Sequence, residues 1–159
     1  MSDRAAQLAD ELQQVTDDVI AFVEAAPEGV WQRECAAEQC TVAALACHIA
    51  GGYGAIVDTL VKPIAEGREG PRFSLEDLAG WNAAAAAENT TQSKAVALER
   101  LRTQAPPAIA YVRGLRDEEL QGSGPLPFGG DPMTADAVIE HILIGHPRGH
   151  LASMQAATA

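Results

Sequence analysis

Apolar residues recur at intervals of three and four along most of the sequence, and this spacing constrains the fold more than any other feature. Residues spaced in this way form a stripe on one side of an α-helix, and the stripe must pack against other helices. Alanine supplies much of the remaining apolar content and has the highest helix propensity. We therefore expect an all-α protein. The stripe nearest the N-terminus consists of Leu8, Leu12, Val15, Val19 and Phe22.

Capping and helix-breaking residues divide the sequence into four expected helices. The first runs from about residue 2 to residue 26 and ends at Pro27. Thr41, Ser74 and Thr134 are favourable N-caps for the other three. No strand or internal repeat is expected. Four long helices with short links predict a single four-helix bundle domain over residues 1–159.

The third expected helix is the least regular. It begins at Ser74, weakens at residues 89–93, where it either breaks or bends, and resumes to Leu115. Pro106 and Pro107 lie inside its second part, and proline removes a backbone donor and clashes with the preceding turn. We therefore expect a kink there.

Charge and hydropathy exclude several classes of function. The chain carries 11 Lys and Arg against 22 Asp and Glu, a net charge of −11, which argues against binding to nucleic acid or to anionic membranes. The N-terminus lacks the apolar stretch of a secretion signal, and no run of 18 uncharged apolar residues is expected to span a membrane. We expect a cytoplasmic protein in which Cys35, Cys40 and Cys47 stay reduced, with Cys47 packed as a small apolar residue.

Two histidines in the last helix suggest a metal site. His146 and His150 are four residues apart, so their side chains lie on one helix face, one turn apart, where both can bind one ion. Because two ligands are too few, a third must come from another helix, and His48 lies in an apolar run of the second helix. The alternative is an ordinary polar helix end, where a protonated histidine interacts well with the helix dipole.

The sequence around the histidine pair departs from the usual composition of a helix. Gly145, Pro147 and Gly149 together oppose helix formation by about 5 kcal/mol. Such departures are common at functional sites, although the helix could also stop near Gly145 and resume after Pro147 without any function. His141 precedes His146 by five residues, so we expect it on the surface or in packing.

Other residues allow two interpretations each. Gly51, Gly52 and Gly54 in the second helix either let helices approach closely or make room beside His48. Three large aromatic residues either line a substrate pocket or belong to the core, and core is the preferred interpretation. These are Trp31, Tyr53 and Trp81.

Several short motifs occur in an order that is similar to a known family. Trp31 is followed by Thr41-Val42-x-x-Leu45-x-x-His48, then by Trp81-Asn82-Ala83, residues 115–120 (LRDEEL), and His146-x-x-x-His150-Leu151. With these motifs the chain resembles the DinB/YfiT-like superfamily of metal-binding four-helix bundles, which includes the N-terminal domains of mycothiol-dependent maleylpyruvate isomerases. The resemblance covers nearly the whole chain.

The resemblance implies a metal centre with defined ligands. One histidine from the second helix and a pair from the fourth would bind the ion, and these roles fall on His48, His146 and His150. Members of the family typically carry zinc or nickel, with water completing the coordination, and often form homodimers. Some use a low-molecular-weight thiol as cofactor. A small-molecule substrate is therefore expected.

Three functions are compatible with such a site. The first is a metal-dependent thiol transferase or isomerase, because coordination lowers the pKa of a thiol. The second is a metal-dependent hydrolase that activates water, although Glu140, the nearest acidic residue of the last helix, is not clearly placed as a base. The third is a non-catalytic, stress-related bundle whose metal holds two helices together. The sequence assigns no catalytic residue, and it identifies neither the metal nor the substrate.

Overall fold

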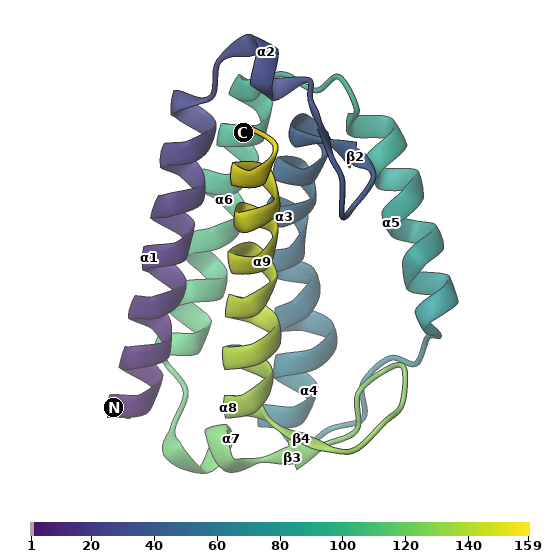
Figure 1. The fold of residues 1–159 in the computed structure, drawn as a ribbon. Helices are drawn as coiled ribbons and strands as arrows, with labels where there is room; N and C mark the ends of the chain where they lie inside the picture. The colour runs from purple at the N-terminus through teal and green to yellow at the C-terminus, as the bar shows by residue number, and fades with distance from the viewer. Residues whose placement is uncertain (1) are drawn as a thin grey trace.

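The chain folds into a bundle of four long helical segments, as expected from the apolar spacing (Figure 1). The computed structural model describes residues 2–159. Two of the four segments change from α-helix to π-helix part-way along their length. The segments are α1 (Asp3–Ala25); α3 (Val42–Ile56) with η1 (Val57–Val61) and α4 (Lys62–Ala65); α6 (Lys94–Arg113); and α8 (Ala135–Val138) with η2 (Ile139–Ile144) and α9 (Gly145–Ala156).

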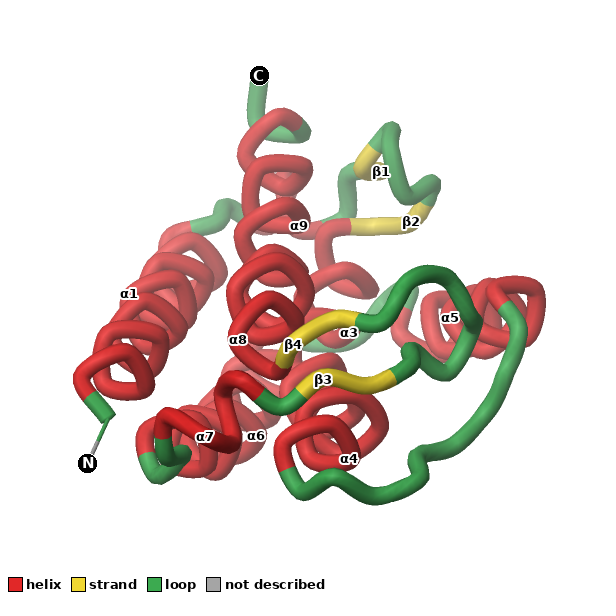
Figure 2. Tube along the Cα trace, turned by 90° about the horizontal axis from the view of Figure 1, so that it is seen from below, coloured by secondary structure: helices red, strands yellow, loops and turns green. Residues whose placement is uncertain are grey.

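Short elements connect the long segments, and some of them are strands, which the sequence did not predict. β1 (Glu34–Cys35) pairs antiparallel with β2 (Cys40–Thr41), and β3 (Ser123–Gly124) pairs antiparallel with β4 (Met133–Thr134) (Figure 2). Each strand has only two residues, too few to show an alternating pattern. The remaining elements are α2 (Glu28–Trp31), α5 (Leu75–Asn89) and α7 (Asp117–Gln121).

The three expected N-caps are confirmed. The hydroxyl of Thr41 accepts a hydrogen bond from the Ala44 amide at the start of α3, and Thr134 caps α8 in the same way. Ser74 begins α5 with a capping box, in which Asp77 also accepts a bond from the Ser74 amide. Local side-chain chemistry therefore fixes where these helices start.

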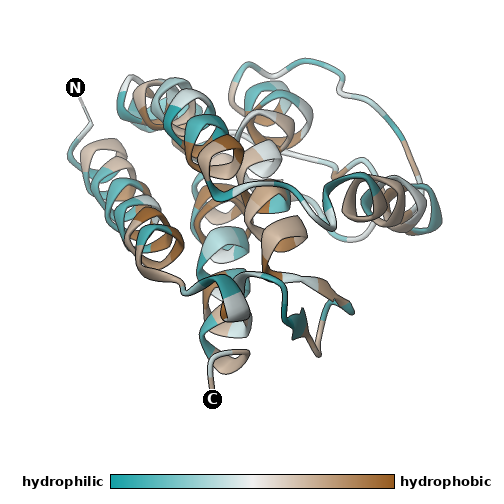
Figure 3. Ribbon diagram, turned by 90° about the horizontal axis from the view of Figure 1, so that it is seen from above, coloured by the Kyte–Doolittle hydropathy of each residue, from teal (hydrophilic) through white to brown (hydrophobic). Residues whose placement is uncertain are grey.

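The expected third helix is in fact two helices with different surroundings. α6 begins at its own N-cap, Ser93, packs against α1 and α3, and continues without interruption through Pro106 and Pro107. α5 lies beside α3 at the edge of the bundle and buries none of its residues (Figures 1 and 3). Its alanine run, Ala83–Ala87, offers too little apolar area to hold it in the core.

Apolar side chains from all four segments fill the centre of the bundle. Figure 3 shows the apolar residues on helix faces that turn toward one another. Trp31 and Tyr53 are buried, as expected for core residues, and each makes one hydrogen bond, to the Gln92 carbonyl and to the Thr16 hydroxyl respectively. For Trp81 the preferred core interpretation is wrong, because this side chain on α5 is 56% exposed.

The second helical segment is strongly apolar. Over the described residues, Val42–Ala65 is a helix long and apolar enough to cross a membrane by length and composition, although Asp58 and Lys62 interrupt it, so it holds no uncharged run of 18 residues. Within its most apolar window 61% is buried inside the bundle. A central helix that contacts neighbours on several sides needs this composition.

Candidate metal centre

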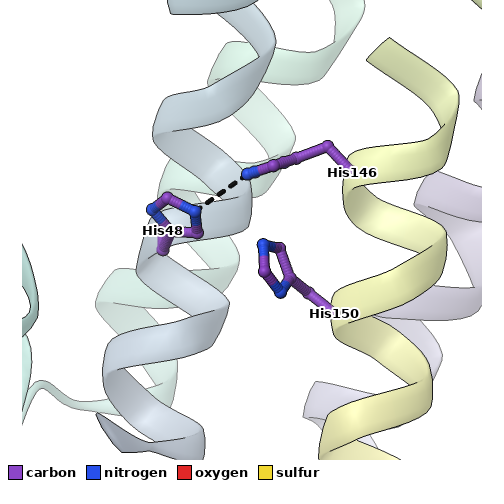
Figure 4. A group of neighbouring side chains, drawn as sticks. All are labelled: His48, His146 and His150. Atoms are coloured by element: carbon purple, nitrogen blue, oxygen red, sulfur yellow. Dashed lines mark hydrogen bonds between the residues drawn. The ribbon is translucent and has the colours of Figure 1, made fainter. Parts of the chain in front are cut away.

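The three predicted ligands lie together between the second and fourth helical segments. His48 comes from the middle of α3, and His146 and His150 come from successive turns of α9 (Figure 4). Their ring centroids are 4.6–5.0 Å apart, and one nitrogen from each ring lies within 4.8 Å of the others. All three side chains are partly exposed. His141 is exposed and lies outside this cluster.

A π-helical segment lies in the last helix, directly before the turn that contains Pro147 and the histidine pair. The helix does not stop at Gly145; it changes to π-helix over Ile139–Ile144 and returns to α-helix at Gly145. Pro147 is then the third residue of α9 and follows directly after the π-segment. π-Segments inside helices occur often at functional sites. This one immediately precedes the ligand pair.

Gly52 makes room for one of the ligands. A Cβ atom at this position would lie 2.6 Å from Cε1 and 2.8 Å from Nδ1 of His146. At Gly51, by contrast, a Cβ atom would meet nothing within 4 Å. The interpretation that these glycines make room at the site is therefore right for Gly52, and the side chain concerned is His146 rather than His48.

Burial lowers the pKa of two of the histidines, which favours their neutral form. It lowers the pKa of His146 to about 3, with further contributions from His48 and His150. Burial, followed by the charge of His150, also lowers the pKa of His48, against a smaller opposing effect of Glu38. The Nε2 atoms of His48 and His146 are 2.8 Å apart, at hydrogen-bond distance. Neutral imidazole is the form that binds a metal ion.

A fourth residue, Glu38, belongs to the site and was missed in the sequence analysis. It lies between β1 and β2, and its Oε1 is 3.0 Å from Nδ1 of His150 and accepts a hydrogen bond from the Ser153 hydroxyl at 2.8 Å. Its Oε2 is buried without a partner, which typically costs about 1–3 kcal/mol or more for a charged group. No local pattern could reveal this contact, because Glu38 lies 112 residues from His150.

The donor set fits a divalent metal ion. Two nitrogens that bind one ion at about 2.0–2.1 Å each lie about 2.9–3.4 Å apart. The 2.8 Å between His48 and His146 therefore needs only a small outward movement. Imidazole nitrogen suits zinc, nickel, copper and iron. The Glu38 carboxylate, with Oε1 3.0 Å from His150, also lies beside the cluster, where a negative charge would balance part of the charge of such an ion.

Comparison with known proteins identifies the family and the fold. The family model described as the DinB superfamily matches residues 11–154. The chain belongs to the DinB superfamily. Among solved structures, YfiT from Bacillus subtilis, described as a probable metal-dependent hydrolase with an unusual four-helix bundle topology, aligns with a TM-score of 0.78 at 16% identity, over 99% of this chain and 88% of that chain. This likeness shows the fold. No curated protein matches the sequence.

The cysteines of this DinB superfamily protein lie outside the histidine cluster. Cys47 is buried, as expected, and burial raises its pKa above the ordinary value for a thiol. Cys35 and Cys40 face each other across the β1–β2 pair as free thiols, and burial is the main cause that raises the pKa of Cys35 to about 11. Thiols with raised pKa values are poor nucleophiles at neutral pH.

Proposed function

We propose that this DinB superfamily protein is a metal-dependent enzyme that binds one divalent ion, zinc or nickel, through His48, His146 and His150. One observation carries the proposal. One nitrogen from each of three imidazoles, which come from two helices, lies within 4.8 Å of the others at a partly exposed position. Gly52 and Pro147 lie beside this cluster, although both residue types are unfavourable inside a helix. A centre built only to join helices would not need to be open to solvent.

Hydrolysis of a small molecule is the first candidate reaction. A bound ion would supply a Lewis acid and lower the pKa of water to near 7. The three histidines would hold the ion and leave positions free for water and substrate, as in catalytic sites with three protein ligands. The description of YfiT as a probable metal-dependent hydrolase supports this candidate.

Transfer or isomerisation with a low-molecular-weight thiol is the second candidate, and the environment of Cys47 favours it over any reaction of a protein thiol. Cys47 adjoins His48 in sequence but is buried, with a raised pKa. The nucleophile of a thiol reaction would therefore be external. Mycothiol is the thiol that the family resemblance implies.

Metal content and two assays test the proposal. Protein purified without an affinity tag should contain one divalent ion per chain, by mass spectrometry of the elements. A His48→Ala variant should contain none, and the exposed His141→Ala should retain it as a matched control. Two assays of the metal-loaded protein then distinguish the candidate reactions. Activated esters test for hydrolysis, and electrophiles supplied with mycothiol or glutathione test for thiol transfer. A native protein that takes up neither zinc nor nickel would contradict the proposal, and a loaded protein inactive in both assays would favour a non-catalytic bundle.

The setting of this activity is also a proposal. We infer that the protein works as a homodimer on a small-molecule substrate, as its family resemblance implies, and that it does so in the cytoplasm. Sedimentation velocity measures the oligomeric state directly, and a single species with the mass of one chain would contradict the dimer.

A further inference from the structure

Glu38 occupies an unusual position for a carboxylate. Its neighbours Ala37 and Gln39, in the short connection between β1 and β2, are exposed. The Glu38 side chain itself is only 20% exposed, and its Oε2 is buried. A carboxylate in such a connection could remain fully solvated, and moving it inward is unfavourable unless it gains partners. Its partners therefore indicate its role.

Both partners of Glu38 lie on α9, three residues apart. Oε1 accepts a hydrogen bond from the Ser153 hydroxyl and lies 3.0 Å from Nδ1 of His150. An ionised carboxylate can only accept hydrogen bonds, so this contact places a proton on Nδ1 of His150. In the neutral ring the lone pair is then on Nε2, the nitrogen that can bind a metal ion.

Two other roles for Glu38 fit the geometry less well. It is not a fourth ligand, because the cluster of mutually close donor atoms comprises the three histidines alone among the described residues. It is also not explained as a simple ion pair, because a doubly protonated His150 would have no lone pair for a metal.

Building on the proposed metal site, we propose that Glu38 is a positioning residue of the metal centre: through Oε1 it holds His150 in the Nδ1–H tautomer, with Nε2 directed to the ion. Ser153 donates a hydrogen bond to the same oxygen and so helps to fix the carboxylate. Ligating histidines commonly donate their second N–H to a carboxylate in this way, which fixes the ring and raises its basicity. The β1–β2 connection thereby becomes part of the site.

The tautomer can be measured without any metal. Long-range proton–nitrogen NMR correlations of the metal-free protein should show His150 with its proton on Nδ1. Glu38→Gln, which keeps an oxygen acceptor, should retain this tautomer, whereas Glu38→Ala should give a mixture of both. Glu34→Gln is the matched control, because Glu34 is an exposed carboxylate of the same hairpin. A proton on Nε2 in the wild type, or an unchanged tautomer in Glu38→Ala, would overturn the inference.

Cobalt titration, followed by visible absorption, measures the consequence for metal binding. Glu38→Ala should weaken the affinity for Co²⁺ about 10–100-fold. Glu38→Gln should lose less, and Glu34→Gln should match the wild type. Ser153→Ala, which leaves Glu38 in place but removes its second donor, should weaken binding by a smaller factor and serves as an independent variant if Glu38→Ala unfolds.

The two proposals fail in different ways. No Co²⁺ binding by the wild type would overturn the proposed function. Binding by the wild type with equal affinity in Glu38→Ala would overturn the role of Glu38 alone and leave the three-histidine site in place.

Discussion

Gly52 and Gly51 are adjacent on α3, yet only Gly52 faces His146, one of the proposed ligands. A methyl group at position 52 would overlap the His146 ring, so Gly52→Ala must displace that ring. We expect this variant to bind Co²⁺ at least about 10-fold more weakly, since misplaced ligands lose affinity on the scale seen for lost supporting contacts. The absorption titration measures it.

Gly51→Ala is the control for this change. Nothing lies within 4 Å of its added methyl group, so the substitution should leave Co²⁺ affinity unchanged. It should raise the free energy of unfolding by up to about 1 kcal/mol, because alanine is the better helix former. Equal Co²⁺ affinities in the two variants would contradict the role assigned to Gly52.

The lowered pKa of His146 predicts a pH-dependent stability of the metal-free protein. The unfolded chain takes up a proton near pH 6.5, whereas the folded chain resists it until about pH 3. Stability is therefore complete above about pH 6.5 and falls as the pH drops toward 3. Between pH 7.5 and 4.5 this residue should account for a loss of about 2–3 kcal/mol.

Urea unfolding in the presence of a chelator measures this loss. His146→Asn removes the titrating group, so its free energy of unfolding should fall less over the same pH range than that of the wild type. His141→Ala, at an exposed histidine, should behave as the wild type does. A pH dependence that is identical in all three proteins would refute the assignment to His146.

Two N-caps of the same kind should contribute differently to the stability of the protein. Thr134 caps the helical segment that carries two ligands and packs in the core, while Ser74 caps α5, which buries no residue. Thr134→Ala should lower the global free energy of unfolding by about 1 kcal/mol. Ser74→Ala should destabilise α5 locally, because a weakly packed element opens by itself.

Hydrogen exchange separates local from global effects. In Ser74→Ala, amide protection should fall in α5 while the slowest amides of α3 and α6 stay unchanged. In Thr134→Ala, protection of those core amides should fall. If Ser74→Ala reduced core protection as much as Thr134→Ala does, α5 would be a cooperative part of the bundle.

The elements also show what the sequence could predict. α1, α3 and the caps Thr41 and Thr134 follow from local spacing and side-chain chemistry, which depend on few neighbours. Of the two alternatives at residues 89–93, the break is right, since α5 ends at Asn89 and α6 begins at Lys94. The sequence could not decide between them, because helical composition alone does not tell whether α5 packs in the core. The two-residue strands were missed because their pairing depends on partners several residues away.

The residues of the candidate site, too, could be predicted only in part from the sequence. The spacing of His146 and His150 and the apolar surroundings of His48 predicted that the three side chains lie together. This is confirmed, since one nitrogen from each lies within 4.8 Å of the others. Glu38 was not predictable, since its contact joins a short connection to a helix more than a hundred residues later. Ligand residues show a local pattern, whereas the residues that orient them depend on the tertiary fold.

Metal binding should raise the thermal stability of the whole protein. An ion that binds only the folded chain stabilises it by about 2.7 kcal/mol at a free concentration of 100 times Kd. For a chain of this length this raises Tm by about 5–10 °C. Differential scanning calorimetry with zinc should show this rise in the wild type and in His141→Ala, and no rise in His150→Ala. A rise of the same size in His150→Ala would mean that zinc binds elsewhere.

A break in the chain within α5 should leave the bundle assembled, because α5 buries none of its residues. Its C-terminal end is held by hydrogen bonds from Trp31 to Gln92 and from Thr41 to Thr90, and the segment before it by one from Phe73 to Pro127. Its alanine run contributes nothing to the core. Elastase cleavage within Ala83–Ala87 would separate α1 and α3, with His48, from α6 and α9, with the histidine pair. The two fragments should stay associated, and a bound metal ion would link them. The cleaved protein should therefore keep its fold as a complex of two fragments.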